Sequence, residues 1–222
     1  KVEDRIRSLV SKRLIITGCM AKAYTSLCEK IAPNASLIST QNISFIKEGL
    51  DKRVVYLDYR KEKKVGLEKE FQGEASVQIS EGCVSNCSYC GTKLAKGSLY
   101  SYPVKEIVDE VKRFNGRVNL TATDTGCYGL DIGLTLVDLL KELVKEDVYV
   151  RVGMMNPRHV LGFVDALVEV FKSSKIFKFI HIPVQSGSNK VLTDMGRGYT
   201  VEDFKMIVDK FRVIDGISIA TD

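Results

Sequence analysis

The sequence contains no long apolar segment. No run of about eighteen apolar residues is present, so no transmembrane helix is predicted. The first stretch, KVEDRIRSLVSKR (1–13), is charged and has no apolar core with a cleavage site, which is not the pattern of a secretory signal. Neither an internal repeat nor a low-complexity segment is present. We therefore expect a globular cytoplasmic protein and no association with a membrane.

The chain is also poor in proline and has only a small excess of positive charge. Four prolines, 45% apolar residues and 27% charged residues are typical of an ordinary globular protein, and 222 residues suffice for one large domain or one and a half small ones. The net charge of +5 permits a polyanionic partner such as RNA without requiring one. No ladder of aromatic side chains for stacking bases is evident.

Cysteines are few, but half of them are clustered. The six are Cys19, Cys28, Cys83, Cys87, Cys90 and Cys127. Without a secretory signal, a disulfide framework is not expected. Clustered thiols in a reducing compartment more often hold a metal.

The clustered thiols, Cys83, Cys87 and Cys90, have the spacing C-x3-C-x2-C, and no fourth cysteine or nearby histidine follows at ligand spacing. A structural zinc site needs four ligands, and so does an iron–sulfur cube that only carries electrons. Three ligands leave one metal position open, and an open position is where a substrate or cofactor binds. A zinc site with a distant fourth ligand and three unrelated thiols are the alternatives.

Strand-like and helix-like patterns alternate along most of the chain. Residues 1–50 read as a βαβα alternation, and residues 51–74 as a charge-rich linker with one short strand at 53–57 and a solvated KEKK run at 61–64. From residue 75 onward five strands alternate with helices, including one helix opened by Pro157 and running to about residue 174. Such an alternation predicts an α/β fold with parallel strands, either an incomplete TIM-like barrel or an open doubly wound sheet.

The cysteine loop, SEGCVSNCSYCGTKLAKG (80–97), follows the first of these five strands, at the strand end where α/β folds place their active sites. With Tyr89 as an aromatic residue before the last cysteine, it resembles the cluster loop of the radical S-adenosylmethionine (SAM) superfamily. The resemblance implies a partial TIM-like barrel in residues 75–222. It also implies a 4Fe–4S cluster on the three loop cysteines, whose open iron is chelated by the amino and carboxylate groups of SAM.

Four further stretches resemble one branch of that superfamily. They are LTATDTGCYGLDIG (120–133), GMMNP (153–157), HIPVQSGSNKVLTDMGRGYT (181–200) and ISIATD (217–222). They are similar to the methylthiotransferases, and the first two to the branch that acts on N6-threonylcarbamoyladenosine in tRNA. The resemblance implies that one SAM methylates a sulfur on a second cluster. Another SAM yields a 5′-deoxyadenosyl radical that abstracts hydrogen from C2 of the modified adenine, which then receives the methylthio group.

Three alternatives to this function stay open at this point. The chain is a methylthiotransferase for isopentenyladenosine in tRNA, another radical SAM enzyme, or a zinc-stabilised RNA-binding module without enzymatic activity. The family resemblance implies tRNA and an electron donor protein as partners. A monomer is expected, although nothing in the sequence defines the oligomeric state.

The TGCM stretch (17–20) resembles a second cluster motif of the same family. The family's first domain supplies three cysteines to a second 4Fe–4S cluster, and Cys19 matches the last of them. The other two would precede residue 1, so residues 1–50 are expected to be only the later part of that domain. The last barrel strand and a small β-rich RNA-binding domain would follow residue 222, and a chain without them is expected to bind tRNA weakly. The alternative for Cys19 is a buried small apolar residue after a strand.

The resemblance further implies a set of residues that hold SAM at the carboxyl ends of the strands. The set is Tyr89, Thr123, Asp124, Asn156, Gln185, Ser186 and Arg197. Arg197 suits the methionine carboxylate because guanidinium forms charge-assisted hydrogen bonds. The alternatives are a turn or cap for Asp124, loop hydrogen bonds for Gln185 and a solvated surface charge for Arg197.

Some residues depart from the family pattern or have weaker signals. Relatives often have Gln or Glu at the place of Thr123 and a hydroxyl residue at the place of Met155, which cannot donate a hydrogen bond. The remaining expectations are a passive role for Cys127, a core position for Cys28, a hydrogen-bonded core position for His181 and a surface position for His159 in the first turn of a helix. No general base is assigned.

Overall fold

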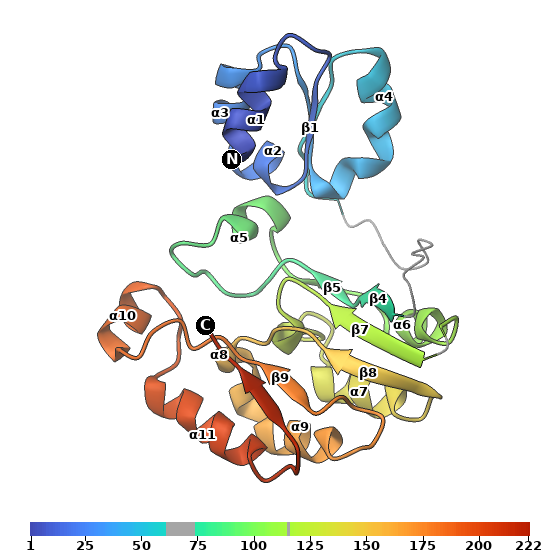
Figure 1. Ribbon diagram of the computed structural model, residues 1–222, viewed down its shortest axis with the longest axis vertical. Coiled ribbons are helices and arrows are strands. Elements are labelled where there is room, and N and C mark those ends of the chain that lie inside the picture. The colour runs from blue at the N-terminus through green and yellow to red at the C-terminus, as the bar shows by residue number, and fades with distance from the viewer. Residues whose placement is uncertain (61–73, 115) are drawn as a thin grey trace. The chain divides into compact units, whose positions relative to one another are not determined.

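The computed structural model describes residues 1–60, 74–114 and 116–222 (Figure 1). They form two compact units, one of residues 1–60 with 90–97 and the other of residues 74–89 with 98–222. Most of the expected linker 51–74, including its KEKK run, lies outside the described residues, and the short strand expected at 53–57 is found at Val55–Tyr56. No helix in the described ranges is long and apolar enough to cross a membrane.

The first unit contains a three-stranded parallel sheet in the order β1-β2-β3. The central strand β2 is buried at all three positions, as expected for a parallel strand that is covered on both faces. Cys28 is fully buried in this core, which confirms its predicted position. The elements are α1 (Val2–Leu9), β1 (Ile15–Thr17), α2 (Cys19–Ala23), α3 (Thr25–Ile31), β2 (Ser36–Ile38), the 3-10 helix η1 (Thr40–Phe45), α4 (Ile46–Asp51), β3 (Val55–Tyr56) and α5 (Gly91–Lys96).

Two helices of this unit, α1 and α5, have no counterpart among the sequence-based predictions. Helix α1 buries a single residue, Ile6. One apolar position in a charged segment does not form a helical period, so the sequence does not predict this helix. Helix α5 begins directly after the last loop cysteine and packs against α2. The side chains of Gln41 and Tyr59 donate hydrogen bonds to the carbonyls of Lys96 and Leu94, at 3.1 and 2.7 Å.

The second unit contains parallel strands that follow one another in chain order, together with a short antiparallel pair, β5 and β6. Strand β4 pairs with β7 and β7 with β8, β9 pairs with β10, and a bridge between Val150 and Ile176 continues the sheet beyond β8. A doubly wound sheet reverses its strand order at a switch point, whereas a TIM-like barrel keeps it. The predicted α/β fold is therefore confirmed, and the strand order is that of the barrel alternative.

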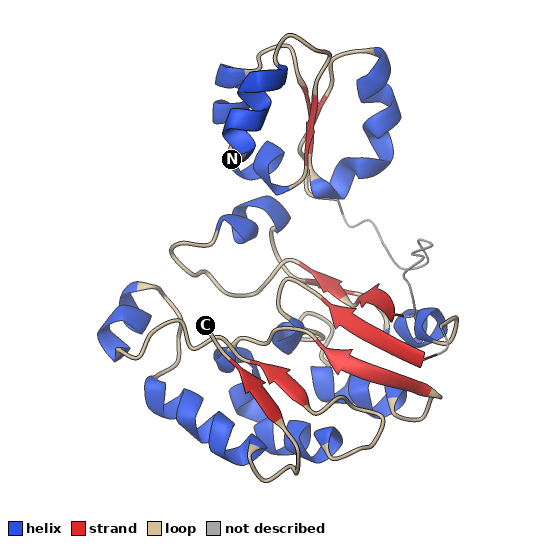
Figure 2. Ribbon diagram, viewed as in Figure 1, coloured by secondary structure: helices blue, strands red, loops and turns tan. Residues whose placement is uncertain are grey.

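Side chains alternate between the two faces of this sheet. Val118, Leu120 and Val150 are buried, whereas Arg117 and Arg151 on the same strands are exposed. Helices cover the apolar face, and the arrows of the parallel strands β7, β8, β9 and β10 point toward the same edge, which places their strand-end loops together there (Figure 2). The elements are β4 (Glu74–Gln78), β5 (Ser80–Glu81), β6 (Tyr100–Ser101), α6 (Val104–Val111), β7 (Gly116–Thr121), η2 (Thr125–Cys127), α7 (Leu136–Leu143), β8 (Val148–Val152), α8 (Pro157–Val160), η3 (Leu161–Phe163), α9 (Val164–Phe171), β9 (Phe179–His181), α10 (Asn189–Asp194), α11 (Val201–Phe211) and β10 (Ser218–Ala220).

The helix expected from Pro157 to about residue 174 is interrupted. Helix α8 is a single turn, and the 3-10 turn η3 separates it from α9, with Phe163 at a non-helical φ of −139°. Gly162 lies in that turn and has a low helix propensity. The interruption lets the first turn face the end of the sheet while α9 packs on its apolar side, with Phe171 against Phe211 at 5.3 Å between ring centroids.

Candidate functional site: a thiol-rich loop at the carboxyl edge of the sheet

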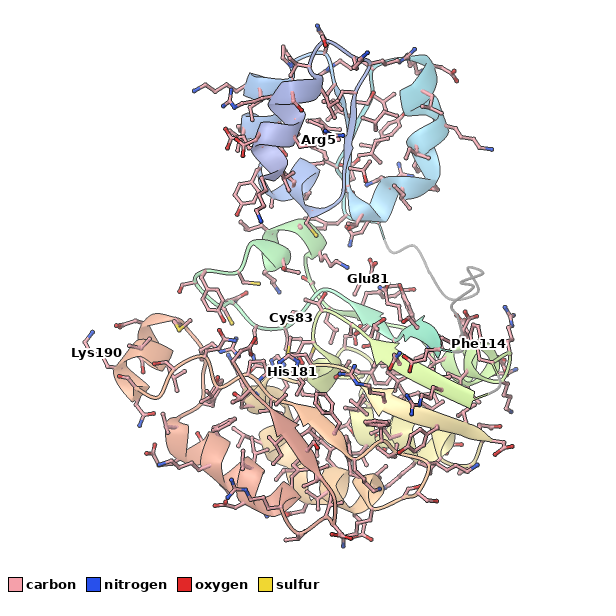
Figure 3. The ribbon with its side chains drawn as sticks, viewed as in Figure 1. Arg5, Glu81, Cys83, Phe114, His181 and Lys190 are labelled. Atoms are coloured by element: carbon pink, nitrogen blue, oxygen red, sulfur yellow. The ribbon has the colours of Figure 1, made fainter. Side chains whose placement is uncertain are left out.

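The loop between β5 and α5 contains three half-buried cysteines that form no disulfide. Figure 3 labels the first of them, Cys83, just after β5. Cys83 and Cys87 belong to the second unit, whereas Cys90 is the amino-terminal cap residue of α5 and belongs to the first. The shared metal site of the three thiols stays a prediction.

The sulfur of Cys83 lies in a polar setting. The backbone N–H of Ser85 donates to it at 3.3 Å. The thiol of Cys127 is a second donor, and it is the main cause of a lowered pKa of Cys83, while the pKa of the buried Cys127 is raised. The Cys127 thiol also lies 3.2 Å from the carbonyl oxygen of Asp124, so two acceptors compete for its one proton. Cys127 thus contacts the cysteine loop through Cys83.

The sulfur of Cys87 contacts a buried guanidinium. Arg197 is 6% exposed, and its Nη1 donates to Cys87 Sγ at 3.3 Å and to the hydroxyl of Tyr89 at 3.1 Å. Its Nε donates to the hydroxyl of Tyr199, which in turn donates to the carbonyl of Val184 at 2.7 Å. The alternative of a solvated surface charge is therefore wrong for Arg197, and its contact with a methionine carboxylate stays a prediction.

Tyr89 and Gln185 continue this network. The Tyr89 hydroxyl donates to Gln185 Oε1 at 3.1 Å. Gln185 has a φ of 68°, the one positive value among the non-glycine residues that the structure describes, and its N–H donates to the carbonyl of Asp222. Backbone strain of this kind clusters at functional sites. Ser186 follows directly, and its hydroxyl accepts a hydrogen bond from the N–H of Ser188 at 3.1 Å.

Asp124 is buried at the end of β7, and its carboxylate accepts three hydrogen bonds. The donors are the N–H groups of Gly126 and Asn156, at 2.9 and 3.1 Å, and Nδ1 of His159, at 2.6 Å. Asp124 caps η2, which confirms the helix-cap role that was one of the alternatives for this residue. These three hydrogen bonds join the Asp124 carboxylate to two segments of the site, η2 and the start of α8.

His159 is 7% exposed, so the prediction of a surface position was wrong. It lies in α8, a single turn capped by Asn156, and its Nδ1 faces Asp124 after β7. Its second ring nitrogen, Nε2, is 2.9 Å from the hydroxyl of Ser85 in the cysteine loop. Sequence reasoning had no signal for this contact, since Ser85 and His159 are 74 residues apart.

Two further predicted residues lie at the strand ends. The side chain of Asn156 accepts a hydrogen bond from the N–H of Arg158 and caps α8. The hydroxyl of Thr123 is buried and has no hydrogen-bond partner among the described residues. Such a group is usually satisfied by a ligand or an ordered water. Met155 is fully buried in the hydrophobic core and presents no polar group to the site.

Cys19 lies outside these networks of described residues, and His181 meets them through Asp222. Cys19 is exposed at the start of α2, so its alternative as a buried apolar residue is wrong, and its part in a second cluster stays a prediction. His181, labelled in Figure 3, ends β9 and is half-buried. Its Nε2 lies 3.4 Å from a carboxylate oxygen of Asp222, which places it at the rim and not in the core.

A second set of possible metal ligands shares Cys83 with the loop. Ligand atoms of Cys83, Asp124, Cys127 and His159 all lie within 4.8 Å of one another. Cysteine, histidine and aspartate are zinc ligands. However, Asp124 and His159 already bond each other, and Nε2 of His159 is engaged by Ser85. A metal ion here has to replace these hydrogen bonds.

Fold and site together define an α/β half-barrel with a loop of soft thiol ligands at the carboxyl edge of its sheet. The family model of the radical SAM superfamily matches residues 77–218, more than half of the chain. The chain therefore belongs to the radical SAM superfamily.

Curated relatives match almost the whole chain. It is 39% identical over 240 residues to a probable threonylcarbamoyladenosine tRNA methylthiotransferase of Methanothermobacter thermautotrophicus, an alignment that covers 100% of this chain and 57% of that protein. It is 34% identical over 248 residues to the human threonylcarbamoyladenosine tRNA methylthiotransferase, covering 99% of this chain and 42% of the relative. The chain spans about half the length of the curated relatives it matches.

A solved structure has the same fold. The cobalamin-dependent SAM radical enzyme OxsB with aqua-cobalamin bound aligns with a TM-score of 0.61 at 16% identity, covering 98% of this chain and 38% of that one. At this identity the similarity concerns the fold alone.

Proposed function

We propose that this chain is part of a tRNA methylthiotransferase that transfers a methylthio group to C2 of N6-threonylcarbamoyladenosine. The observation that carries the proposal is the C-x3-C-x2-C loop at the carboxyl edge of a radical SAM half-barrel, in a chain that matches curated threonylcarbamoyladenosine tRNA methylthiotransferases over nearly its full length. The proposed partners are tRNA and an electron donor protein, and the proposed location is the cytoplasm.

The donor set fits a 4Fe–4S cluster. Cys83, Cys87 and Cys90 form no disulfide in the described part of the chain, and thiolates are the soft ligands that iron–sulfur clusters use. Two of their sulfurs already accept N–H hydrogen bonds, from Ser85 and Arg197, as is typical around cluster thiolates. A cluster with SAM bound at its open iron supplies a 5′-deoxyadenosyl radical. Cys19 is the proposed contribution of this chain to a second cluster.

The surrounding residues have the proposed task of holding SAM. Arg197 carries its charge in a buried position beside Cys87 and Tyr89, where a guanidinium binds the methionine carboxylate without competition from bulk water. The hydroxyl of Thr123, which has no hydrogen-bond partner among the described residues, lies just after β7 and is the proposed hydrogen-bond donor for SAM. Gln185, Ser186 and Asn156 complete the strand-end groups. Asp124 orients one of them, Asn156, by accepting the hydrogen bond of its backbone N–H.

Nucleoside analysis tests the substrate. We expect tRNA from cells lacking the gene to lose 2-methylthio-N6-threonylcarbamoyladenosine and to keep the unmodified threonylcarbamoyl form. Loss of methylthio-isopentenyladenosine instead identifies the alternative substrate. An unchanged nucleoside profile contradicts both assignments.

A zinc-stabilised RNA-binding module is the second candidate. It is favoured by the group of Cys83, Asp124, Cys127 and His159, whose ligand atoms lie within 4.8 Å of one another. Metal analysis after anaerobic reconstitution separates the two candidates. About four irons for the loop cysteines, with matching sulfide, support the enzyme, whereas stoichiometric zinc without iron supports the module.

A further inference from the structure

A chain of buried hydrogen bonds links the cysteine loop to two strand ends. Asp124 follows β7, His159 lies in α8 after β8, and Ser85 lies between the first two loop cysteines. Asp124 Oδ2 is 2.6 Å from His159 Nδ1, and His159 Nε2 is 2.9 Å from Ser85 Oγ. The three residues are 3%, 7% and 4% exposed, so water does not compete for these bonds.

The direction of each hydrogen bond follows from the chemistry of the groups. Oδ1 of Asp124 is held by the N–H groups of Gly126 and Asn156, which fixes the carboxylate and leaves Oδ2 for the imidazole. A carboxylate only accepts, so Nδ1 of His159 carries the proton and donates. In the neutral imidazole, Nε2 then accepts from the hydroxyl of Ser85. The result is a rigid connection from β7 through α8 to the loop.

Ser85 connects these buried hydrogen bonds to the sulfur of Cys83. Its backbone N–H donates to Cys83 Sγ at 3.3 Å, while its side chain is held by His159. With the side chain fixed, the orientation of the amide is fixed as well. Hydrogen bonds to thiolate sulfur stabilise the more negative, reduced form of an iron–sulfur cluster and so raise its reduction potential.

We propose that His159 is a positioning residue that, anchored by Asp124, holds the amide of Ser85 against the sulfur of Cys83 and thereby sets the reduction potential of the bound cluster. This inference rests on the proposed function, because it requires a cluster on the loop cysteines. The sequence predicts no role for His159. The proposal gives it control of the hydrogen bond that the amide of Ser85 donates to Cys83.

The same three side chains resemble the order of groups in an acyl-transfer triad, but the site does not support that chemistry. A nucleophilic serine must face its substrate and lie beside donors for a developing oxyanion. Ser85 is 4% exposed, and its neighbouring N–H is already bonded to Cys83. The hydroxyl therefore acts as a structural donor.

The test compares the midpoint potential of the cluster in wild-type protein with that in His159→Phe and Ser85→Ala, using the complete protein reconstituted anaerobically with iron and sulfide. We expect both variants to shift the potential to more negative values while iron content stays near that of the wild type. His159→Phe should shift it more, because it frees the Ser85 hydroxyl and leaves Asp124 without the imidazole. His159→Gln, which offers both a donor and an acceptor, should recover part of the shift.

Ser88→Ala is the matched control. Ser88 lies in the same loop, but its hydroxyl donates a hydrogen bond to the carbonyl of Asp194 at 3.2 Å instead of to a sulfur. The midpoint potential of the cluster in Ser88→Ala should equal that of the wild type. Equal potentials in wild type, His159→Phe and Ser85→Ala overturn the inference alone, even if the variants melt at a lower temperature. A wild-type protein that binds zinc and no iron overturns the proposed function, and the inference with it.

Discussion

Replacing Asp124 with alanine removes one acceptor that serves three buried donors. The N–H groups of Gly126 and Asn156 and the Nδ1–H of His159 all bond to its carboxylate. A buried donor left without its partner costs about 1–3 kcal/mol. Three such donors sum to about 3–9 kcal/mol, which is comparable to the whole free energy of unfolding of a typical domain, about 5–15 kcal/mol.

Asp124→Asn separates the loss of an acceptor from the loss of charge. The amide keeps one oxygen for the two backbone donors, and the imidazole can change its tautomer to accept from the new NH2 group. What is lost is the charge-assisted part of the interaction, so we expect a cost of about 1–3 kcal/mol. Asp124→Ala should therefore be several-fold more destabilising than Asp124→Asn.

Urea unfolding of the metal-free, reduced protein, followed by circular dichroism, measures both costs. Asp209→Ala is a suitable control, because Asp209 is exposed on α11 and meets Arg212 only at 4.0 Å. An exposed ion pair of this kind contributes little to the free energy of unfolding, so the urea midpoint of Asp209→Ala should equal that of the wild type. A free energy of unfolding for Asp124→Ala within about 1 kcal/mol of the wild type refutes the hydrogen-bond assignment.

Three further predictions concern the thiols and the buried guanidinium. Cys87→Ala in the complete, reconstituted protein should abolish formation of 5′-deoxyadenosine, and retained cleavage of SAM contradicts the cluster assignment. In metal-free protein, Cys83 should react with iodoacetamide at a lower pH than Cys28, as followed by mass spectrometry. Hydrogen bonding from Cys127 lowers the pKa of Cys83, whereas burial raises the pKa of Cys28. Equal reactivity of the two thiols contradicts this. Arg197→Lys should weaken SAM binding roughly tenfold or more in calorimetry with iron content unchanged, because an ammonium cannot replace the planar fork, and unchanged affinity excludes the carboxylate contact.

The alternation of strands and helices could be predicted because each element has a clear period. Strand β8, with Val148, Val150 and Val152 buried on one face, has the alternation that a half-buried strand requires. The order of strands in the sheet is a tertiary property, so the periodicity alone left the barrel and the doubly wound sheet as alternatives, and the family resemblance favoured the barrel. The break at Phe163 was missed because Gly162 is a weak signal inside an otherwise helical pattern.

The cysteine loop could be found from spacing alone, but its surroundings could not. Ser85, Asp124 and His159 come from three loops that meet only because parallel strands bring their carboxyl ends to one edge. A lone histidine in a first helical turn has no pattern that distinguishes exposure from burial. The networks around the thiols therefore became visible only with the fold.

Electron paramagnetic resonance of the reduced, iron-reconstituted complete protein, recorded before and after addition of SAM, tests the central claim most directly. The account predicts a 4Fe–4S signal that depends on Cys83, Cys87 and Cys90 and that changes when SAM occupies the open iron. A signal that SAM leaves unchanged, or a protein that takes up stoichiometric zinc and no iron, would contradict it.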